Sequence, residues 1–268
     1  MTKLDSRSKD LRRNVIRMIE VDKRGHIGPA LSLIEILRVL YDFFLKFQSQ
    51  KPDWEDRDRL ILSKGHGCLA LYSILADKGF FNKRELDTFC QPDSILGGHP
   101  EKDKTPGVEA STGALGHGLP IGVGMALAAR INNKNHRVVV IMGDGEINEG
   151  SVWESAMSAA KHNLSNLILF IDHNKLQSYG RTEEVLDMSP LPEKWKSFGF
   201  LVYEIDGHDI NEIEEVLNEM LLKTDKPKVV ICHTIKGKGL PWAEANPKWH
   251  HKSGLKNEDF EEMYKCLE

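Results

Sequence analysis

The sequence has few cysteines, no long apolar run and little imbalance of charge. Its four cysteines are scattered over 268 residues and form no CxxC pair, so neither a disulfide framework nor a zinc site is expected. No apolar stretch reaches the length of a membrane span, and the polar start at residues 1–5 is unlike a signal peptide. These absences together predict a cytoplasmic protein.

Several partner classes are excluded in the same way. With 36 basic and 40 acidic residues the formal charge is −4, which argues against nucleic acid or an anionic membrane as the main partner. The chain has no GxxxxGK loop followed by Ser or Thr, no GxGxxG after a strand and no HExxH, so ATP, NAD and zinc-protease interpretations have no support.

What the chain does contain is a regular alternation of strands and helices. Apolar strands are predicted at residues 60–62, 137–142, 167–172, 200–205 and 228–234. Helices are predicted at residues 5–21, 32–47, 69–77, 83–89, 118–131, 151–162, 192–197, 210–222 and 257–267. This pattern predicts an α/β fold, with a mostly parallel sheet and helices on both faces. We expect one domain over 1–268, with an N-terminal helical extension and a C-terminal tail.

Capping residues are predicted at two of these helices. Ser32 is expected to cap helix 32–47, with Glu35 three residues later completing a capping box. Glu146 and Glu149 precede helix 151–162, where acidic side chains complement the helix dipole.

Oxygen ligands for a hard cation follow two neighbouring strands. Asp144 comes directly after strand 137–142, and Asn174 follows strand 167–172. Because ligands collect beyond the carboxyl ends of adjacent parallel strands, the two side chains are expected to meet around one ion. Taken alone, either element is more often a plain turn or loop.

A diphosphate would complete such a site. The carbonyl of Leu176 is a third candidate ligand, and Gly143 and Gly145 let the backbone approach a phosphate without a Cβ in the way. Magnesium takes about six oxygens, so diphosphate and water would fill its shell. A bridging dication also reverses the repulsion between the Asp144 carboxylate and a phosphate.

Histidines form the second signal. Several of the 11 histidines stand beside glycine, among them His26, His66, His99 and His117, and two more, His250 and His251, follow Trp249. A histidine in a glycine-bordered loop is open to a ligand, and it donates to phosphate or transfers protons near neutral pH. Residues 111–118 form a glycine-rich loop directly before the predicted helix 118–131. Backbone N–H groups at such a helix start bind anions. Each of these histidines, taken alone, is more often an ordinary loop residue.

In this order, the segments resemble the amino-terminal, diphosphate-binding half of transketolases. The matching segments are Gly25-His26, 64–67, 98–101, 111–116, the Gly-Asp-Gly…Asn pair, 234–239 and Trp249-His250. The Gly-Asp-Gly…Asn pair marks thiamine diphosphate enzymes in general. The histidine set with the Thr-Gly-x-Leu-Gly sequence narrows the resemblance to transketolases.

This resemblance implies a role for each matched residue. Magnesium, or Ca²⁺ or Mn²⁺ in its place, would be held by Asp144, Asn174 and the carbonyl of Leu176. Contacts to thiamine diphosphate would come from His66, Leu115, Gly116, Gly143, Asp144, Gly145, Glu146, Asn174 and His250. His26, His99 and His250 would be catalytic. The implied reaction is transfer of a two-carbon ketol unit from a ketose phosphate to an aldose phosphate.

Three positions depart from the family pattern. His117 stands where the family commonly has Gln, and Ile27 replaces a common Pro at what we expect to be the substrate entrance. His251 follows His250, and His250 is favoured as the active one because it directly follows Trp249. The sugar specificity and the roles of His117 and His251 therefore stay open.

Full-length transketolases continue into a pyrimidine-binding domain that carries the activating glutamate. The chain ends at Glu268, so the resemblance implies a separate first subunit, a second subunit supplying that glutamate, and an α2β2-like assembly. Three alternatives remain: the α subunit of a 2-oxo acid dehydrogenase, a transketolase relative acting on an unusual sugar, and a non-catalytic cofactor-binding subunit. His66 and His99 favour sugar chemistry over the first.

Overall fold

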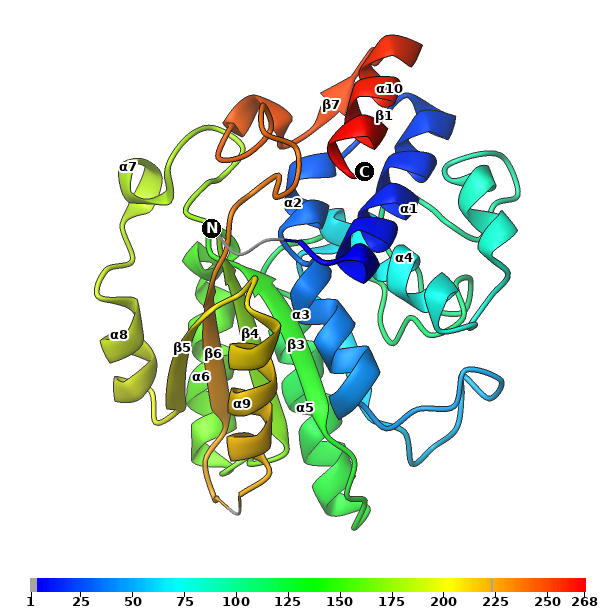
Figure 1. Cartoon of the computed structure of the whole chain (residues 1–268). Helices are drawn as coiled ribbons and strands as arrows, with labels where there is room; N and C mark the ends of the chain where they lie inside the picture. Colours follow the sequence, from blue (N-terminus) through cyan, green and yellow to red (C-terminus); the bar gives the residue numbers. More distant parts are fainter. Residues whose placement is uncertain (1–3, 223) are drawn as a thin grey trace.

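A five-stranded parallel sheet forms the centre of the computed structural model, which describes residues 4–222 and 224–268 (Figure 1). The predicted polar start therefore lies partly outside the described residues. The strands run in the order β2-β3-β4-β6-β5. Their bounds are β2 (Arg59–Leu62), β3 (Val138–Gly143), β4 (Leu167–His173), β5 (Leu201–Asp206) and β6 (Lys228–His233). The predicted α/β fold is confirmed.

Alternate residues of each strand face two separate apolar layers. Val139 and Ile141 of β3 join the layer that contains buried residues of α1 (Ser6–Asp22), α3 (Ile34–Val39), α4 (Cys68–Asp77) and α9 (Ile210–Met220). Val138 and Val140 join the opposite layer, with α5 (Gly118–Ile131), α6 (Gly150–Lys161) and α8 (Leu191–Ser197). Burial on both faces explains why the inner strands β3 and β4 are apolar along most of their length. Figure 1 shows α9 and α6 on opposite sides of the sheet.

A small second sheet joins two distant parts of the chain. The two-residue strand β1 (Arg24–Gly25) pairs antiparallel with β7 (Lys252–Ser253). Neither strand was predicted, because two residues carry no periodicity. The pairing places the residues that follow β1 beside those that precede β7. The terminal helix α10 (Asn257–Cys266) packs near α1 (Figure 1).

The predicted capping box at Ser32 is wrong. Ser32 has helical backbone angles, φ −71° and ψ −20°, whereas an N-cap residue needs an extended backbone. Its hydroxyl instead donates to Asp172 at 2.7 Å, and Glu35 binds Arg12. The predicted helix 32–47 is shorter in the structure, where α3 continues into a π-helical turn at Leu40–Phe44. A separate short helix, α2 (Ile27–Leu31), comes just before it.

Short elements fill the remaining segments. The predicted helix 83–89 is a 3-10 helix over Lys83–Thr88, and the predicted loop 173–190 contains α7 (Thr182–Leu186). Further 3-10 turns lie at Gly65–Gly67, Glu146–Asn148 and Pro247–Trp249. Glu149 is the N-cap of α6 but makes no side-chain capping bond. No helix of the described residues is long and apolar enough to cross a membrane.

Candidate active site

A cavity of about 300 Å³ opens where β3 and β4 end. It is lined by residues from each of the predicted segments: His26, Lys64, His66, His99, Leu115, Gly143, Asp144, Gly145, Glu146, Asn174, Leu176, Lys236 and His250. The fold thus gathers segments that are separated by more than two hundred residues, as His26 and His250 are. Of the predicted site residues, Gly116 alone is missing from this lining.

Gly116 lies directly behind the lining, in a turn that needs glycine. Its φ is +77°, and a Cβ there would come within 2.5 Å of the Glu149 Cβ. Its N–H donates to Glu146 at 2.9 Å, and its carbonyl accepts the Ser151 hydroxyl at 2.9 Å. Both backbone groups are therefore used to hold the turn in place.

The Asp144 carboxylate is buried and has no basic side chain as an ion-pair partner among the described residues. Only 5% of the residue is exposed. Its oxygens accept the backbone N–H groups of Gly145, at 2.8 Å, and Lys175. Burial, helped by the charge of Asp172, raises the pKa of Asp144 to about 7 despite these bonds. A bound positive charge would relieve this penalty.

Asn174 and Leu176 complete the oxygen cluster. The Asn174 amide donates to Asp172 at 3.0 Å, which fixes its orientation, and its Oδ1 accepts the N–H of Leu176 at 3.1 Å. Since Asp144 binds the N–H of Lys175, both side-chain oxygens gather on one turn. Carboxylate, amide and carbonyl oxygens suit a hard cation such as magnesium. The residues present therefore fit the predicted ion, whose remaining ligands would be diphosphate and water.

Asp172 is a buried residue that sequence reasoning missed. Its oxygens accept the hydroxyls of Ser32 and Thr234, the Lys64 ammonium and the Asn174 amide. Burial raises the pKa of Asp172, but Lys64 and the hydrogen bonds outweigh it and hold the pKa below its ordinary value. Asp172 stays ionised and orients Asn174. At the end of an apolar strand, its acidic character was the only available signal.

Glu146 holds the glycine turns rather than capping α6, whose N-cap is Glu149, so the predicted capping role of Glu146 is wrong. One carboxylate oxygen accepts the N–H of Gly116 and the Ser63 hydroxyl. The other accepts the N–H of Gly143 at 3.1 Å. Burial raises the pKa of Glu146 although three donors surround it. Its side chain thus ties the 111–118 loop to the end of β3, while it also lines the cavity.

Histidines from three other segments surround His26, which was predicted to be catalytic together with His99 and His250. Its ring centroid lies 5.4 Å from that of His66, 6.2 Å from His99, 5.4 Å from His250 and 4.7 Å from His251. Burial and neighbouring positive groups lower the pKa of His26 to about 4 and that of His250 to about 3. Both rings are neutral at pH 7, so each carries one donor and one acceptor. Nδ1 of His250 is buried without a partner among the described residues.

The structure shows where the three residues that depart from the family pattern lie. His117 is exposed, its Nδ1 contacts the Leu115 carbonyl at 3.0 Å, and it does not line the cavity. His251 lines an adjoining cavity of about 180 Å³ that shares His26, His66 and His99. Ile27 is 1% exposed and packs in the core, so its expected place at the substrate entrance is wrong.

The family model for the transketolase thiamine diphosphate binding domain matches residues 6–267. The chain belongs to this family. The predicted resemblance to the diphosphate-binding part of transketolases is therefore confirmed. The match also favours membership of the transketolase family over the alternative of a 2-oxo acid dehydrogenase α subunit.

Relatives within the family differ in length. The chain is 44% identical to an apulose-4-phosphate transketolase subunit of Actinobacillus succinogenes, covering 93% of this chain and 90% of the relative. It is 41% identical to the 6-deoxy-6-sulfo-D-fructose transketolase subunit SqwG of a Clostridium species, covering 89% and 88%. Transketolase 2 of Escherichia coli is 39% identical, but the match covers 85% of this chain and only 37% of that protein.

Solved transketolases share the fold. The structure of the Campylobacter jejuni enzyme matches 98% of this chain with a TM-score of 0.91 at 32% identity. The chain spans 42% of that enzyme's length. This family member therefore has the architecture of one part of a longer transketolase.

Proposed function

We propose that the chain is the thiamine diphosphate- and magnesium-binding subunit of a transketolase that is active only with a second subunit. The complete enzyme transfers a two-carbon ketol unit from a ketose phosphate to an aldose phosphate. The observation that carries this proposal is the convergence of the Asp144–Asn174 oxygens and the His26 cluster on one cavity.

Each part of the cavity has a task in this proposal. Asp144, Asn174 and the Leu176 carbonyl hold the metal, and His66 and His250 contact the diphosphate. When bound, thiamine diphosphate supplies a nucleophilic thiazolium carbon. His26 and His99 would contact the sugar hydroxyls, and His250 would move a proton between a substrate oxygen and a nitrogen of its own imidazole ring. Neutral imidazoles suit this task because each donates from one nitrogen and accepts at the other.

The need for a partner is supported by the lengths of the relatives. The chain covers about nine tenths of two relatives named as transketolase subunits, but 37% of Escherichia coli transketolase 2. We propose that a second polypeptide brings the pyrimidine-binding domain and its activating glutamate, in an α2β2 assembly. A cytoplasmic location belongs to the same proposal.

The sugar is proposed to be an unusual one. The similar subunits are named for apulose-4-phosphate and for 6-deoxy-6-sulfo-D-fructose. These names favour the alternative of a transketolase relative with a specialised substrate over the sugars of the pentose phosphate pathway.

Reconstitution with the partner subunit tests the proposal. We expect the purified pair to transfer ketol units from a ketose phosphate donor with thiamine diphosphate and Mg²⁺ present, and the pure single chain to show no transfer. A panel of donors, with the two named sugars included, identifies the substrate. Turnover by the pure single chain contradicts the dependence on a partner. A folded pair that binds the cofactor and transfers no ketol unit from any donor contradicts the activity.

A further inference from the structure

The cavity of about 180 Å³ beside the histidine cluster has a wall of its own. It adjoins the main cavity, with which it shares His26. Its lining also includes Asp22, Arg24 and His251, which do not line the main cavity. None of these three residues takes part in the proposed binding of the metal or the cofactor. We call this space the side cavity.

The pairing of β1 with β7 explains why Arg24 and two histidines share this wall. Side chains two residues apart on a strand point to the same face, so Arg24 and His26 belong to one face of the pair. Gly25 pairs with Lys252 in antiparallel register, which makes His26 and His251 the next residues opposite each other. Their ring centroids lie 4.7 Å apart. One face of this small sheet therefore presents all three side chains to the side cavity.

Gly25 faces the opposite way, toward the core. A Cβ at this position would come within 2.2 Å of Cδ1 of Ile19, a buried residue of α1. The backbone of β1 thus packs closely against α1. This contact fixes the direction in which the neighbouring Arg24 leaves the strand.

Asp22 orients the Arg24 guanidinium from one side. Nε of Arg24 donates to Oδ2 of Asp22 at 3.0 Å, and neither terminal nitrogen has a hydrogen-bond partner among the described residues. The Arg24 side chain is 64% exposed, so it lies at the open mouth of the side cavity. The terminal nitrogens of a guanidinium form a planar fork that binds two oxygens of a phosphate-like anion at once.

The place of this ion pair is better explained by ligand binding than by stability. An exposed pair of this kind contributes little to the free energy of unfolding. Of the described residues that line the side cavity, Arg24 is the one lysine or arginine, and the neighbouring His26 has a lowered pKa and is neutral at pH 7. Arg24 is therefore the permanent positive charge that an anionic ligand meets on this wall.

We propose that Arg24 binds the anionic end of the sugar substrate, a terminal phosphate or sulfonate, while the reacting carbons lie at the His26 cluster. This inference rests on the proposed function, because it assumes that a sugar reacts at these histidines. The remainder of the donor leaves before the acceptor takes its place, so one such subsite serves both sugars.

Steady-state kinetics of the two-subunit complex tests this role with donors that carry or lack an anionic end. The anionic donors are D-fructose 6-phosphate, 6-deoxy-6-sulfo-D-fructose and apulose 4-phosphate, and D-fructose and apulose are the uncharged ones. Glycolaldehyde is the acceptor throughout, so that the donor alone carries the anion. Arg24→Gln removes the charge, and Arg24→Lys keeps the charge without the fork. Arg84→Gln is the control, since Arg84 is also exposed but lines neither cavity.

We expect Arg24→Gln to lower kcat/KM for the anionic donors about tenfold to a hundredfold, mainly through KM, the usual effect of losing a charged hydrogen bond. The uncharged donors and the Arg84→Gln control should behave as in the wild type. Arg24→Lys should keep part of the preference for the anion, and added salt should reduce that preference because the site is exposed. A loss with the phosphate or the sulfonate donors supports the inference, and the larger loss identifies the oxyanion.

Two results overturn the inference. One is wild-type kcat/KM for the anionic donors in Arg24→Gln. The other is an equal loss for charged and uncharged donors, because Arg24 then only supports the β1–β7 pair. Failure of the wild-type complex to transfer a ketol unit from any donor is a different result, and it contradicts the proposed function itself.

Discussion

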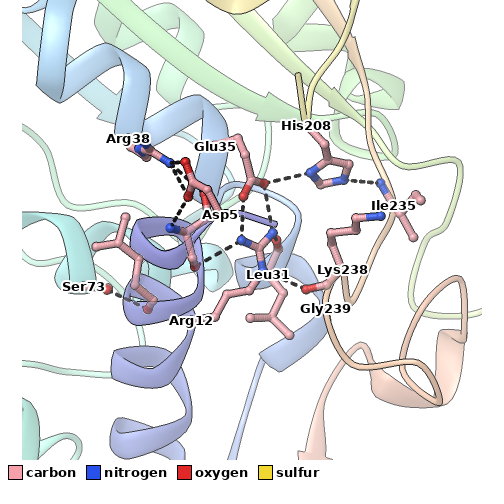
Figure 2. Close-up of polar contacts among 12 residues, drawn as sticks. Asp5, Arg12, Leu31, Glu35, Arg38, Ser73, His208, Ile235, Lys238 and Gly239 are labelled. Carbon is pink, nitrogen blue, oxygen red and sulfur yellow. Dashed lines mark hydrogen bonds and ion pairs between the residues drawn. The ribbon is translucent and has the colours of Figure 1, made fainter. Parts of the chain in front are cut away.

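Nε2 of His208 accepts the backbone N–H of Ile235 at 2.9 Å. The ring is therefore protonated on Nδ1, which donates to Glu35 at 2.8 Å. His208 thus links two parts of the molecule, as Figure 2 shows: the loop after β6, which contains Ile235 and reaches the cavity, and the buried Arg12–Glu35 pair. A residue without contact to the cavity consequently positions one that lines it.

Removing this link should weaken cofactor binding without touching the cavity wall. We expect His208→Ala to raise the dissociation constant of thiamine diphosphate by about tenfold, because a buried hydrogen bond is lost and the loop gains freedom. The binding constant, measured calorimetrically on the two-subunit complex, checks this. His233→Ala is the control, since His233 is half-exposed and pairs with Glu204. Equal affinity in the His208 variant and the control would show that the loop needs no such anchor.

The same network predicts how stability depends on pH. Burial raises the pKa of Glu35, but Arg12 and His208 outweigh it and hold the pKa well below its ordinary value. Such a group stabilises the fold above the unfolded pKa of about 4.3, and this contribution is lost as the pH falls further. Glu35→Gln should cost about 3–5 kcal/mol at neutral pH, because it leaves Arg12 buried without its counter-charge.

Urea unfolding of the chain at several pH values checks this prediction. The gap between wild type and Glu35→Gln should be constant from about pH 7 to 5 and should narrow below about pH 4.3. Both proteins should also lose stability as the pH falls below about 6.5. The pKa values of His26 and His250 are lowered in the folded chain, so at that pH the unfolded chain binds protons at these histidines and the folded chain does not. A gap that does not change down to pH 3.5 would contradict the charged role of Glu35.

The histidine cluster should divide into two functional classes. We expect His26→Ala and His250→Ala to lower kcat about a hundredfold or more, the usual scale for a lost proton-transfer group. His66→Ala should mainly raise the dissociation constant of thiamine diphosphate. His117→Ala should leave both quantities unchanged, because His117 is exposed outside the cavity. Steady-state kinetics and calorimetry on the two-subunit complex separate the classes, and a loss of kcat in His117→Ala would contradict this assignment.

Glu146 should matter for stability as well as for binding. Its two oxygens accept the N–H groups of Gly116 and Gly143 and the Ser63 hydroxyl. Glu146→Gln replaces one acceptor by a donor, so at least one of these groups loses its partner, at a cost of about 1–3 kcal/mol. Urea unfolding of this variant and of Glu154→Gln, an exposed residue of α6, measures the difference. Equal stabilities would show that the glycine turns hold without this carboxylate.

The sheet and its two faces could be predicted because they depend on local patterns. Strands such as Val138–Gly143 are apolar throughout, and each is followed by a helical segment. The Asp144–Asn174 pair followed from the same logic, since the carboxyl ends of neighbouring parallel strands share an edge.

The rest depends on contacts between distant segments. Ser32 looked like an N-cap, but the buried charge of Asp172, 140 residues away, binds its hydroxyl. Asp172 and Lys236 carry no local pattern, because a buried polar residue is recognised only by its partners. The approach of His26 to His250 needs the β1–β7 pairing, which is too short to leave a signal.

The central claim is that this cavity holds thiamine diphosphate through a metal on Asp144. Calorimetric titration of thiamine diphosphate into the two-subunit complex, with Mg²⁺ and with the metal removed by EDTA, tests it most directly. We predict saturable binding of one cofactor per chain that requires the metal, and its loss in Asp144→Asn, which keeps the shape of the side chain without its charge. Undiminished binding in Asp144→Asn, or no binding by the wild-type complex with Mg²⁺, would contradict the claim.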